Sequence, residues 1–152
     1  MKIYVDADAC PKPVREILFR VAIRNQIELL MVANQILQLP VSTKIRMMQV
    51  NKGFDEADNE IVKLINKDDL LVTADIPLAS DAIDKGAIVI NPRGKIYSME
   101  NIKQELATRD LLAHLRDSLE IRGGPQPYND KDKAAFANAL DRIIISHLNS
   151  LK

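Results

Sequence analysis

The chain has 152 residues, a length typical of one domain, and its 21 basic and 21 acidic residues give a formal net charge of zero. Because there is no overall excess of positive charge, any nucleic-acid site has to be a local patch. Aromatic residues make up 4% of the chain and tryptophan is absent, which argues against binding that depends mainly on stacking bases onto aromatic rings. The single cysteine excludes an intrachain disulfide.

The N-terminus and the apolar runs indicate where the protein resides. Asp6 and Asp8 come too early for a secretory signal peptide, and no apolar run approaches the ~20 residues that span a bilayer. A single cysteine fits a reducing compartment. We therefore expect a cytoplasmic protein with no membrane contact.

The first part of the chain predicts strands separated by one helix and a loop. Residues 3–5 are apolar and of strand type, and Pro11 and Pro13 then open a helix, where the missing N–H of proline costs least. Its apolar residues follow at helical spacing. The next elements are a buried strand at 27–33, a loop at 34–42 and a strand at 45–50.

The middle of the chain continues the alternation. It predicts a helix at 54–65, a strand at 70–73, a helix from Asp75-Ile76-Pro77 to about Gly86, a strand at 87–90 and a turn at 91–94. Strands that alternate with helices imply right-handed crossovers and a mainly parallel sheet with both faces covered. The fold class is therefore α/β.

The last third predicts helices only. Ser98 can cap a long helix, Gly123-Gly124-Pro125 interrupts the chain, and a final helix follows. The apolar residues of the long helix are Ile102, Leu106, Leu112 and Leu115, and those of the final helix are Phe136, Leu140, Ile143, Ile144 and Leu148. These helices pack either on the sheet or on a partner subunit, so the oligomeric state stays open and includes a homodimer. We take residues 1–95 as an αβ core and residues 96–152 as a helical extension of the same domain.

Acidic residues follow the predicted strands at their carboxyl ends, which is where parallel sheets bind ligands. Asp6 and Asp8 follow the first strand, and Asp75 follows the fourth by two residues. Asp58 shares the apolar stripe of its helix with Ile61 and Ile65, so its side chain should point toward the sheet. Carboxylates that share a crevice repel one another and favour a hard cation such as Mg²⁺ or Mn²⁺.

Each acid also has a purely structural interpretation. Asp75 precedes Ile76-Pro77 and can serve as an N-cap, and Asp8 can cap the helix that Pro11 opens. A carboxylate such as Asp6, at the end of a central buried strand, has no capping role. Taken together, Asp6, Asp58 and Asp75 favour a functional cluster, with Asp8 as a further metal-ligand candidate.

Phosphodiester hydrolysis is the first chemical hypothesis for this cluster. Carboxylates that hold divalent ions can polarise a phosphate and lower the pKa of a bound water. Asp6 and Asp75 would be ligands, and Asp58 would bind the metal or hold the water. Four bases are candidate phosphate contacts, although each also reads as an ordinary surface residue: Arg93, Lys95, Arg109 and Arg142.

Two alternatives remain open. The Val5-Asp6-Ala7-Asp8 segment resembles the strand-DxD signature of haloacid-dehalogenase-type phosphatases, in which the first aspartate is the nucleophile and the second an acid/base. The helix that Pro11 starts leaves no room for the usual flap of those enzymes. The other alternative is a metal-dependent RNA-binding module without turnover.

Cysteine and histidine give weaker signals. Cys10 lies near a helix N-terminus, where its pKa should fall, but a small buried cysteine is the preferred interpretation. His114 and His147 lack the spacing of a zinc pair and read as ordinary helix residues.

Several long motifs resemble the YaiI/YqxD family of bacterial proteins across nearly the whole chain. They are VDADACP (5–11), VANQ (32–35), GFDEADNEIV (53–62), DLLVTADIPLA (69–79), NPRG (91–94) and RGGP (122–125). The wider resemblance is to the PIN-like nuclease superfamily. Asp6 is similar to the first acid of that pattern, Asp58 to the acid on the helix before the penultimate strand, and Thr73-Ala74-Asp75 to the T-x-D after that strand.

The resemblance implies a PIN-like three-layer fold with additional C-terminal helices, and metal-dependent cleavage of RNA rather than DNA. Asp6, Asp58 and Asp75 would be the catalytic residues and Mg²⁺ or Mn²⁺ the cofactor. The chain departs from the pattern at one point, because no acid aligns with the one that PIN nucleases usually carry on a helix after the first αβ unit. Within residues 27–50 the only acid is Glu28, inside a predicted strand.

Overall fold

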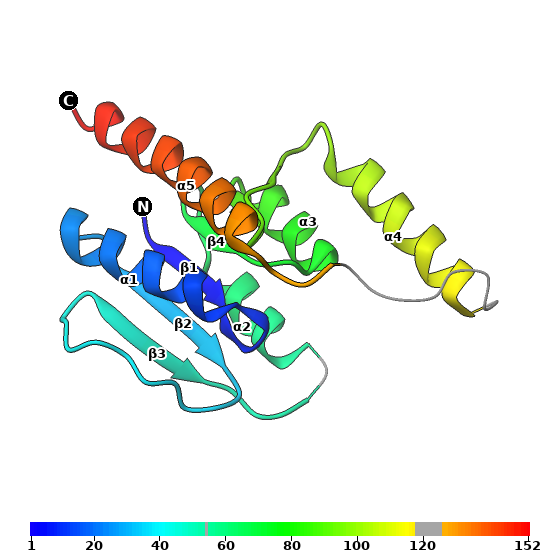
Figure 1. Ribbon diagram of the computed structural model, residues 1–152, viewed down its shortest axis with the longest axis horizontal. Helices are drawn as coiled ribbons and strands as arrows, with labels where there is room; N and C mark the ends of the chain where they lie inside the picture. The colour runs from blue at the N-terminus through cyan, green and yellow to red at the C-terminus, as the bar shows by residue number, and fades with distance from the viewer. Residues whose placement is uncertain (54, 118–125) are drawn as a thin grey trace.

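The computed structural model describes residues 1–53, 55–117 and 126–152. These residues form a three-layer α/β fold around a six-stranded sheet (Figure 1). The strands are β1 (Ile3–Asp6), β2 (Leu29–Ala33), β3 (Ile45–Gln49), β4 (Leu70–Val72), β5 (Ile88–Ile90) and β6 (Ile96–Tyr97). The helices are α1 (Lys12–Asn25), α2 (Glu56–Leu64), α3 (Ile76–Asp84), α4 (Ile102–Asp117) and α5 (Asp130–Ser150), and a short 3₁₀ turn, η1 (Ala7–Ala9), follows β1.

The two faces of the sheet are covered by different helices because side chains alternate along each strand. Ile3 and Val5 of β1 pack with α1 and α5, whereas Tyr4 between them packs with α2 and α3. The strands next to β1 are buried throughout and apolar, as expected for a parallel sheet covered on both sides. The predicted α/β fold with a mainly parallel sheet is confirmed.

The strand order is β3-β2-β1-β4-β5-β6, and all neighbours are parallel except β5 and β6. From β1 the chain moves outward through β2 and β3, and it then returns to place β4 on the other side of β1. Ile3 of β1 is therefore level with Leu29 of β2 and with Leu70 of β4. The boundary between β1 and β4 is the topological switch point of the sheet, where open α/β sheets bind ligands beyond the carboxyl ends of the strands.

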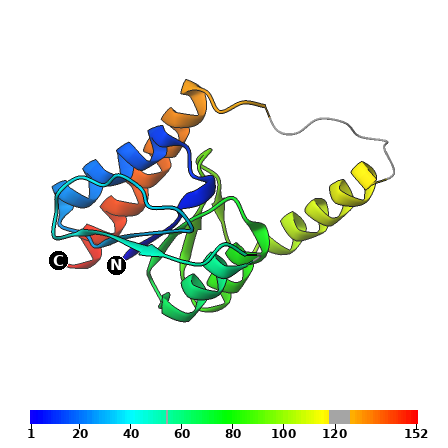
Figure 2. The same cartoon turned by 90° about the horizontal axis from the view of Figure 1, so that it is seen from below.

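The connection between β2 and β3 is unusual for parallel strands, because residues 34–44 contain no helix. This crossover loop runs back along the face of the sheet that carries α1 (Figures 1 and 2). Leu37 and Leu39 pack against the core on that side, next to Phe19 of α1. The loop at 34–42 was predicted, but its position beside α1 was not.

The C-terminal helices behave differently from each other. Phe136, Leu140, Ile143 and Ile144 of α5 are buried against the sheet and α1, so the predicted apolar stripe of the final helix is confirmed and faces the sheet. α4 buries only Ile102 and extends away from the rest of the molecule after its start beside α3 (Figures 1 and 2). Ser98 accepts a hydrogen bond from the Asn101 backbone N–H ahead of α4, as a cap would.

Some predicted boundaries were wrong. α2 begins at Glu56 rather than at residue 54, and Phe54 lies outside the described residues, as does the predicted break at 123–125. Strand β6, with only two residues, was not predicted. None of the helices in the described ranges combines the length and apolarity needed to cross a membrane.

Candidate metal and catalytic site

Asp6 ends β1 at the switch point and is half-buried. Its Oδ2 accepts a hydrogen bond of 3.0 Å from the hydroxyl of Thr73, which follows β4. Burial is the main reason that the pKa of Asp6 is raised; the Thr73 hydrogen bond opposes this, and the charges of Asp75 and Asp8 add to it. A carboxylate under this repulsion gains more than an exposed one from binding a cation.

Thr73 connects Asp6 to Asp75. Its buried side chain uses its hydroxyl in both directions, because Oγ1 also accepts a 3.0 Å hydrogen bond from the Asp75 backbone N–H. Asp75 is the N-cap of α3, and its Oδ1 accepts a hydrogen bond from the Leu78 N–H at 3.0 Å. The capping interpretation of Asp75 is therefore confirmed, and the cap leaves its second carboxylate oxygen for other contacts.

Asp58 approaches the same place from α2. It is half-buried, and Ile61, one turn further on the same stripe, is fully buried, so the predicted inward direction of this stripe is confirmed. The pKa of Asp58 is raised to about 7 by burial first, then by the charges of Asp75 and Asp6, by a hydrogen bond with Asp75, and by Asp55. Asp58 and Asp75 thus lie within hydrogen-bonding distance of each other.

Asp8 lies on the turn η1 and is exposed. Its Oδ2 accepts a 2.8 Å hydrogen bond from the Asn34 backbone N–H, so it ties η1 to the start of the crossover loop. Its charge reaches Asp6, but its hydrogen bond serves the loop rather than α1, which it was predicted to cap. The N-cap residue of α1 is Pro11, whose side chain makes no capping hydrogen bond. The prediction that Asp8 caps this helix was therefore wrong.

Three carboxylates from three elements therefore meet at the switch point: Asp6, Asp58 and Asp75. Within the residues that the structure describes, none of them forms an ion pair with a lysine or arginine. The same ranges contain no set of three acidic, histidine or cysteine side chains already arranged around one metal position. Because the pKa of Asp58 is raised to about 7, partial protonation of this carboxyl near neutral pH reduces the repulsion that a cation would otherwise relieve. An all-oxygen donor set of this charge fits Mg²⁺ or Mn²⁺.

The predicted phosphate contact Arg93 is engaged elsewhere. Its guanidinium donates to Asp132 at 2.7 Å and to the Gln126 carbonyl, and it lies 5.8 Å from the centre of the Tyr128 ring. The turn at 91–94 also needs Gly94, because its φ is +91° and an added Cβ would lie 2.6 Å from the backbone of Ala135. The NPRG motif therefore fastens the start of α5 to the sheet.

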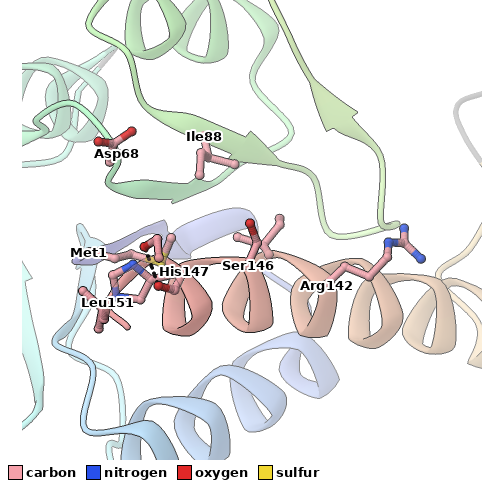
Figure 3. Close-up of a pocket in the computed structure, with 9 residues that line it drawn as sticks. Met1, Asp68, Ile88, Arg142, Ser146, His147 and Leu151 are labelled. Carbon is pink, nitrogen blue, oxygen red and sulfur yellow. Dashed lines mark hydrogen bonds between the residues drawn. The ribbon is translucent and has the colours of Figure 1, made fainter.

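The other three phosphate candidates lie on separate parts of the fold. Lys95 forms an ion pair with Glu105, and Arg109 lies on the projecting helix α4, 3.4 Å from Asp110. Arg142 lines a cavity of about 620 Å³ between α5 and the amino ends of the strands, opposite the edge that carries Asp6 (Figure 3). The structure does not bring these bases together around the carboxylates.

The interpretation of Cys10 as a buried residue is confirmed, whereas the expected fall of its pKa was wrong. Burial raises the pKa of this thiol to about 12, and the nearby charge of Arg15 only partly offsets the effect. Arg15 and Lys12 are two further bases close to the acidic edge. They were not among the phosphate contacts predicted from the sequence. Their signal was present in the charge of residues 12–25, which hold four bases and one acid.

Comparison with known proteins identifies relatives that span the whole chain. A family model described as "Uncharacterized BCR, YaiI/YqxD family" matches residues 4–146. A UPF0178 protein of Hydrogenovibrio crunogenus is 52% identical over 144 residues, which cover 95% of each chain. A UPF0178 protein of Maridesulfovibrio salexigens is 50% identical over 151 residues, 99% of this chain and 100% of the relative. No solved structure matches the chain.

Proposed function

This chain belongs to the YaiI/YqxD family, and we propose that it is a divalent-metal-dependent nuclease that hydrolyses phosphodiester bonds in RNA. The observation that carries the proposal is the meeting of Asp6, Asp58 and Asp75 at the switch point between β1 and β4. Carboxylates gathered at the carboxyl edge of a parallel sheet, with no ion pair to a base among the described residues, are suited to hold a cation rather than an anionic substrate alone.

Asp6 and Asp75 would hold the metal, and Asp58 would contribute a further carboxylate from α2. A divalent ion bound there would polarise a phosphate and lower the pKa of its water. Thr73 fixes the carboxylate of Asp6 relative to the backbone of Asp75, because its hydroxyl donates a hydrogen bond to Asp6 and accepts one from the Asp75 N–H. In the metal-free protein the pKa of Asp58 is about 7, so its carboxyl can hold or release a proton near neutral pH, and a cation held by its neighbours would favour the ionised form.

The phosphatase alternative needs a proton donor two residues after the nucleophile. Asp8 occupies that position, but its Oδ2 accepts a hydrogen bond from the Asn34 N–H and is directed at the crossover loop. This contact favours hydrolysis at a metal over a covalent intermediate on Asp6.

The test is cleavage of a fluorescently labelled single-stranded RNA in Mn²⁺ or Mg²⁺, compared with the same reaction in EDTA. Asp6→Asn and Asp75→Asn should each lower the rate by more than about a hundredfold, because even the loss of a group that only supports a metal ligand costs about 10- to 100-fold. Asp81→Asn is the matched control, since Asp81 is an exposed carboxylate on the same helix that Asp75 caps.

Cleavage that persists in EDTA, or that survives Asp6→Asn, would exclude the proposed site. Trapping of Asp6 by beryllofluoride would instead favour the phosphatase. Metal-dependent RNA binding without cleavage would favour a binding module.

A further inference from the structure

The balanced net charge of the chain hides an uneven distribution. α1 carries four basic residues and one acidic residue, a net charge of +3, although the whole chain is neutral. α2 holds three acids and one base, and α3 holds two acids and no base. The basic residues of α1 are Lys12, Arg15, Arg20 and Arg24. The most basic helix therefore follows directly after the strand that ends at Asp6.

Two of these bases line a groove. Between α1 and the crossover loop lies a cavity of about 500 Å³, which we call the α1 groove. From α1 it is lined by Lys12, Arg15, Glu16 and Phe19, and from the loop by residues 36–40. Ile36 is 80% exposed and adds apolar surface to the rim of this groove.

The groove opens beside the acidic site. The crossover loop starts at Asn34, whose backbone N–H donates to Asp8, one turn of η1 from Asp6. The charges of Arg15 and of Asp6 both act on the thiol of Cys10, so the two features are neighbours. A chain that leaves the carboxylates toward α1 therefore meets Lys12 and Arg15 next.

The lining suits one class of ligand. The bases of α1 attract a polyanion, and a divalent cation held by the three carboxylates would offset their repulsion, so the two features together favour a phosphate chain that crosses from one to the other. The apolar and aromatic surface of Ile36 and Phe19 suits bases that are not stacked in a duplex. An acidic peptide would also be attracted by the bases of α1, but its carboxylate side chains would gain little from the apolar surface of Ile36 and Phe19.

We propose that the α1 groove binds the single-stranded RNA substrate next to the acidic site, with Lys12 and Arg15 contacting backbone phosphates and Phe19 contacting a base. The inference rests on the proposed function for the identity of the substrate. It replaces the four phosphate contacts expected from the sequence, of which Arg93 and Lys95 hold intramolecular partners.

The test measures binding by fluorescence anisotropy of a labelled single-stranded RNA of about 12 nucleotides, a length within the usual site sizes. Lys12→Gln combined with Arg15→Gln should weaken binding about 25-fold at 0.1 M salt, because each lost contact lowers the salt slope by roughly 0.7. Arg20→Gln combined with Arg24→Gln is the matched control. It removes the same charge from the same helix, but these residues line a different groove, between α1 and α5.

A second readout separates the groove from the chemistry. Mn²⁺-dependent hydrolysis of bis(p-nitrophenyl) phosphate, a diester too small to need the groove, should be unchanged in the Lys12→Gln, Arg15→Gln variant. The proposal that RNA binds in the α1 groove would be overturned if both double variants lost RNA affinity equally. It would also be overturned if the unmodified protein bound no RNA either in EDTA or in Mn²⁺. Displacement of the RNA by an oligoglutamate peptide at equal charge concentration would also overturn it.

The two proposals can fail separately. RNA affinity that depends on Lys12 and Arg15, in a protein that hydrolyses no diester, would support the groove while refuting the nuclease. Diester hydrolysis with RNA affinity that is insensitive to both bases would do the reverse.

Discussion

Replacing Asp58 with asparagine should stabilise the metal-free protein at alkaline pH. Asp58 is held half-buried beside Asp75 and Asp6, and this environment raises its pKa to about 7 from an ordinary value of 3.8. Between these two pH values the folded protein holds a proton that the unfolded chain has released. The contribution of this carboxyl to the free energy of unfolding is therefore fully present below about pH 4. It is lost as the pH rises through about 7, where the folded carboxyl ionises against its neighbours.

The size of this effect is limited by solvent. Because Asp58 is only partly buried, screening reduces the contribution of its shifted pKa to about 1 kcal/mol. Asparagine keeps the shape and cannot ionise, so Asp58→Asn should gain about 1 kcal/mol over the unmodified protein at pH 8 and nothing at pH 4. For a domain of this length, that gain corresponds to a rise in Tm of about 2–4 °C.

The assay is urea unfolding in EDTA at several pH values, followed by circular dichroism. Asp81→Asn serves as the control because Asp81 is an exposed carboxylate on α3. With Mn²⁺ present the order should reverse, since a ligand that binds only the folded state stabilises it and the variant lacks one carboxylate. The same difference in stability at pH 4 and pH 8 would refute the crowded cluster of carboxylates.

Three further outcomes follow from the packing. Thr73→Val should cost about 1–3 kcal/mol in urea unfolding, because it leaves the Asp75 N–H unpaired, whereas Thr73→Ser should retain most of the stability. Cys10 should resist iodoacetamide at pH 8 until urea unfolds the protein, since its thiol is buried and has a pKa of about 12; rapid alkylation of the native protein would contradict this. Phe136→Ala should cost about 3–5 kcal/mol in the same unfolding assay, since Phe136 is fully buried where α5 joins the core, and a cost below 1 kcal/mol would mean that α5 docks loosely.

The sheet could be predicted because its central strands are buried on both faces. Segments such as 29–33 and 70–72 are continuous apolar runs, and their alternation with helices leaves few topologies. β6 escaped prediction because it has two residues, Ile96 is partly exposed, and its pairing with β5 is antiparallel. So short a strand carries no periodicity of its own.

The acidic residues could be predicted from their places at strand ends, whereas the basic ones could not. The position of Asp6 after β1 is visible in the sequence, whereas the pairing of β1 with β4, which brings Asp75 beside it, is known only from the structure. The partners of Arg93 depend on where α5 docks, which no local pattern contains. Lys12 and Arg15 could not be predicted as binding residues, because the groove that they line exists only where the crossover loop returns along α1.

Titration of Mn²⁺ into the metal-free protein by isothermal calorimetry, with Asp6→Asn, Asp75→Asn and the control Asp81→Asn alongside, tests the central claim most directly. We expect saturable binding that is lost in the first two variants and kept in the third. Binding that is unchanged by Asp6→Asn, or no binding by the unmodified protein either alone or with a single-stranded RNA present, would contradict a metal site at the switch point.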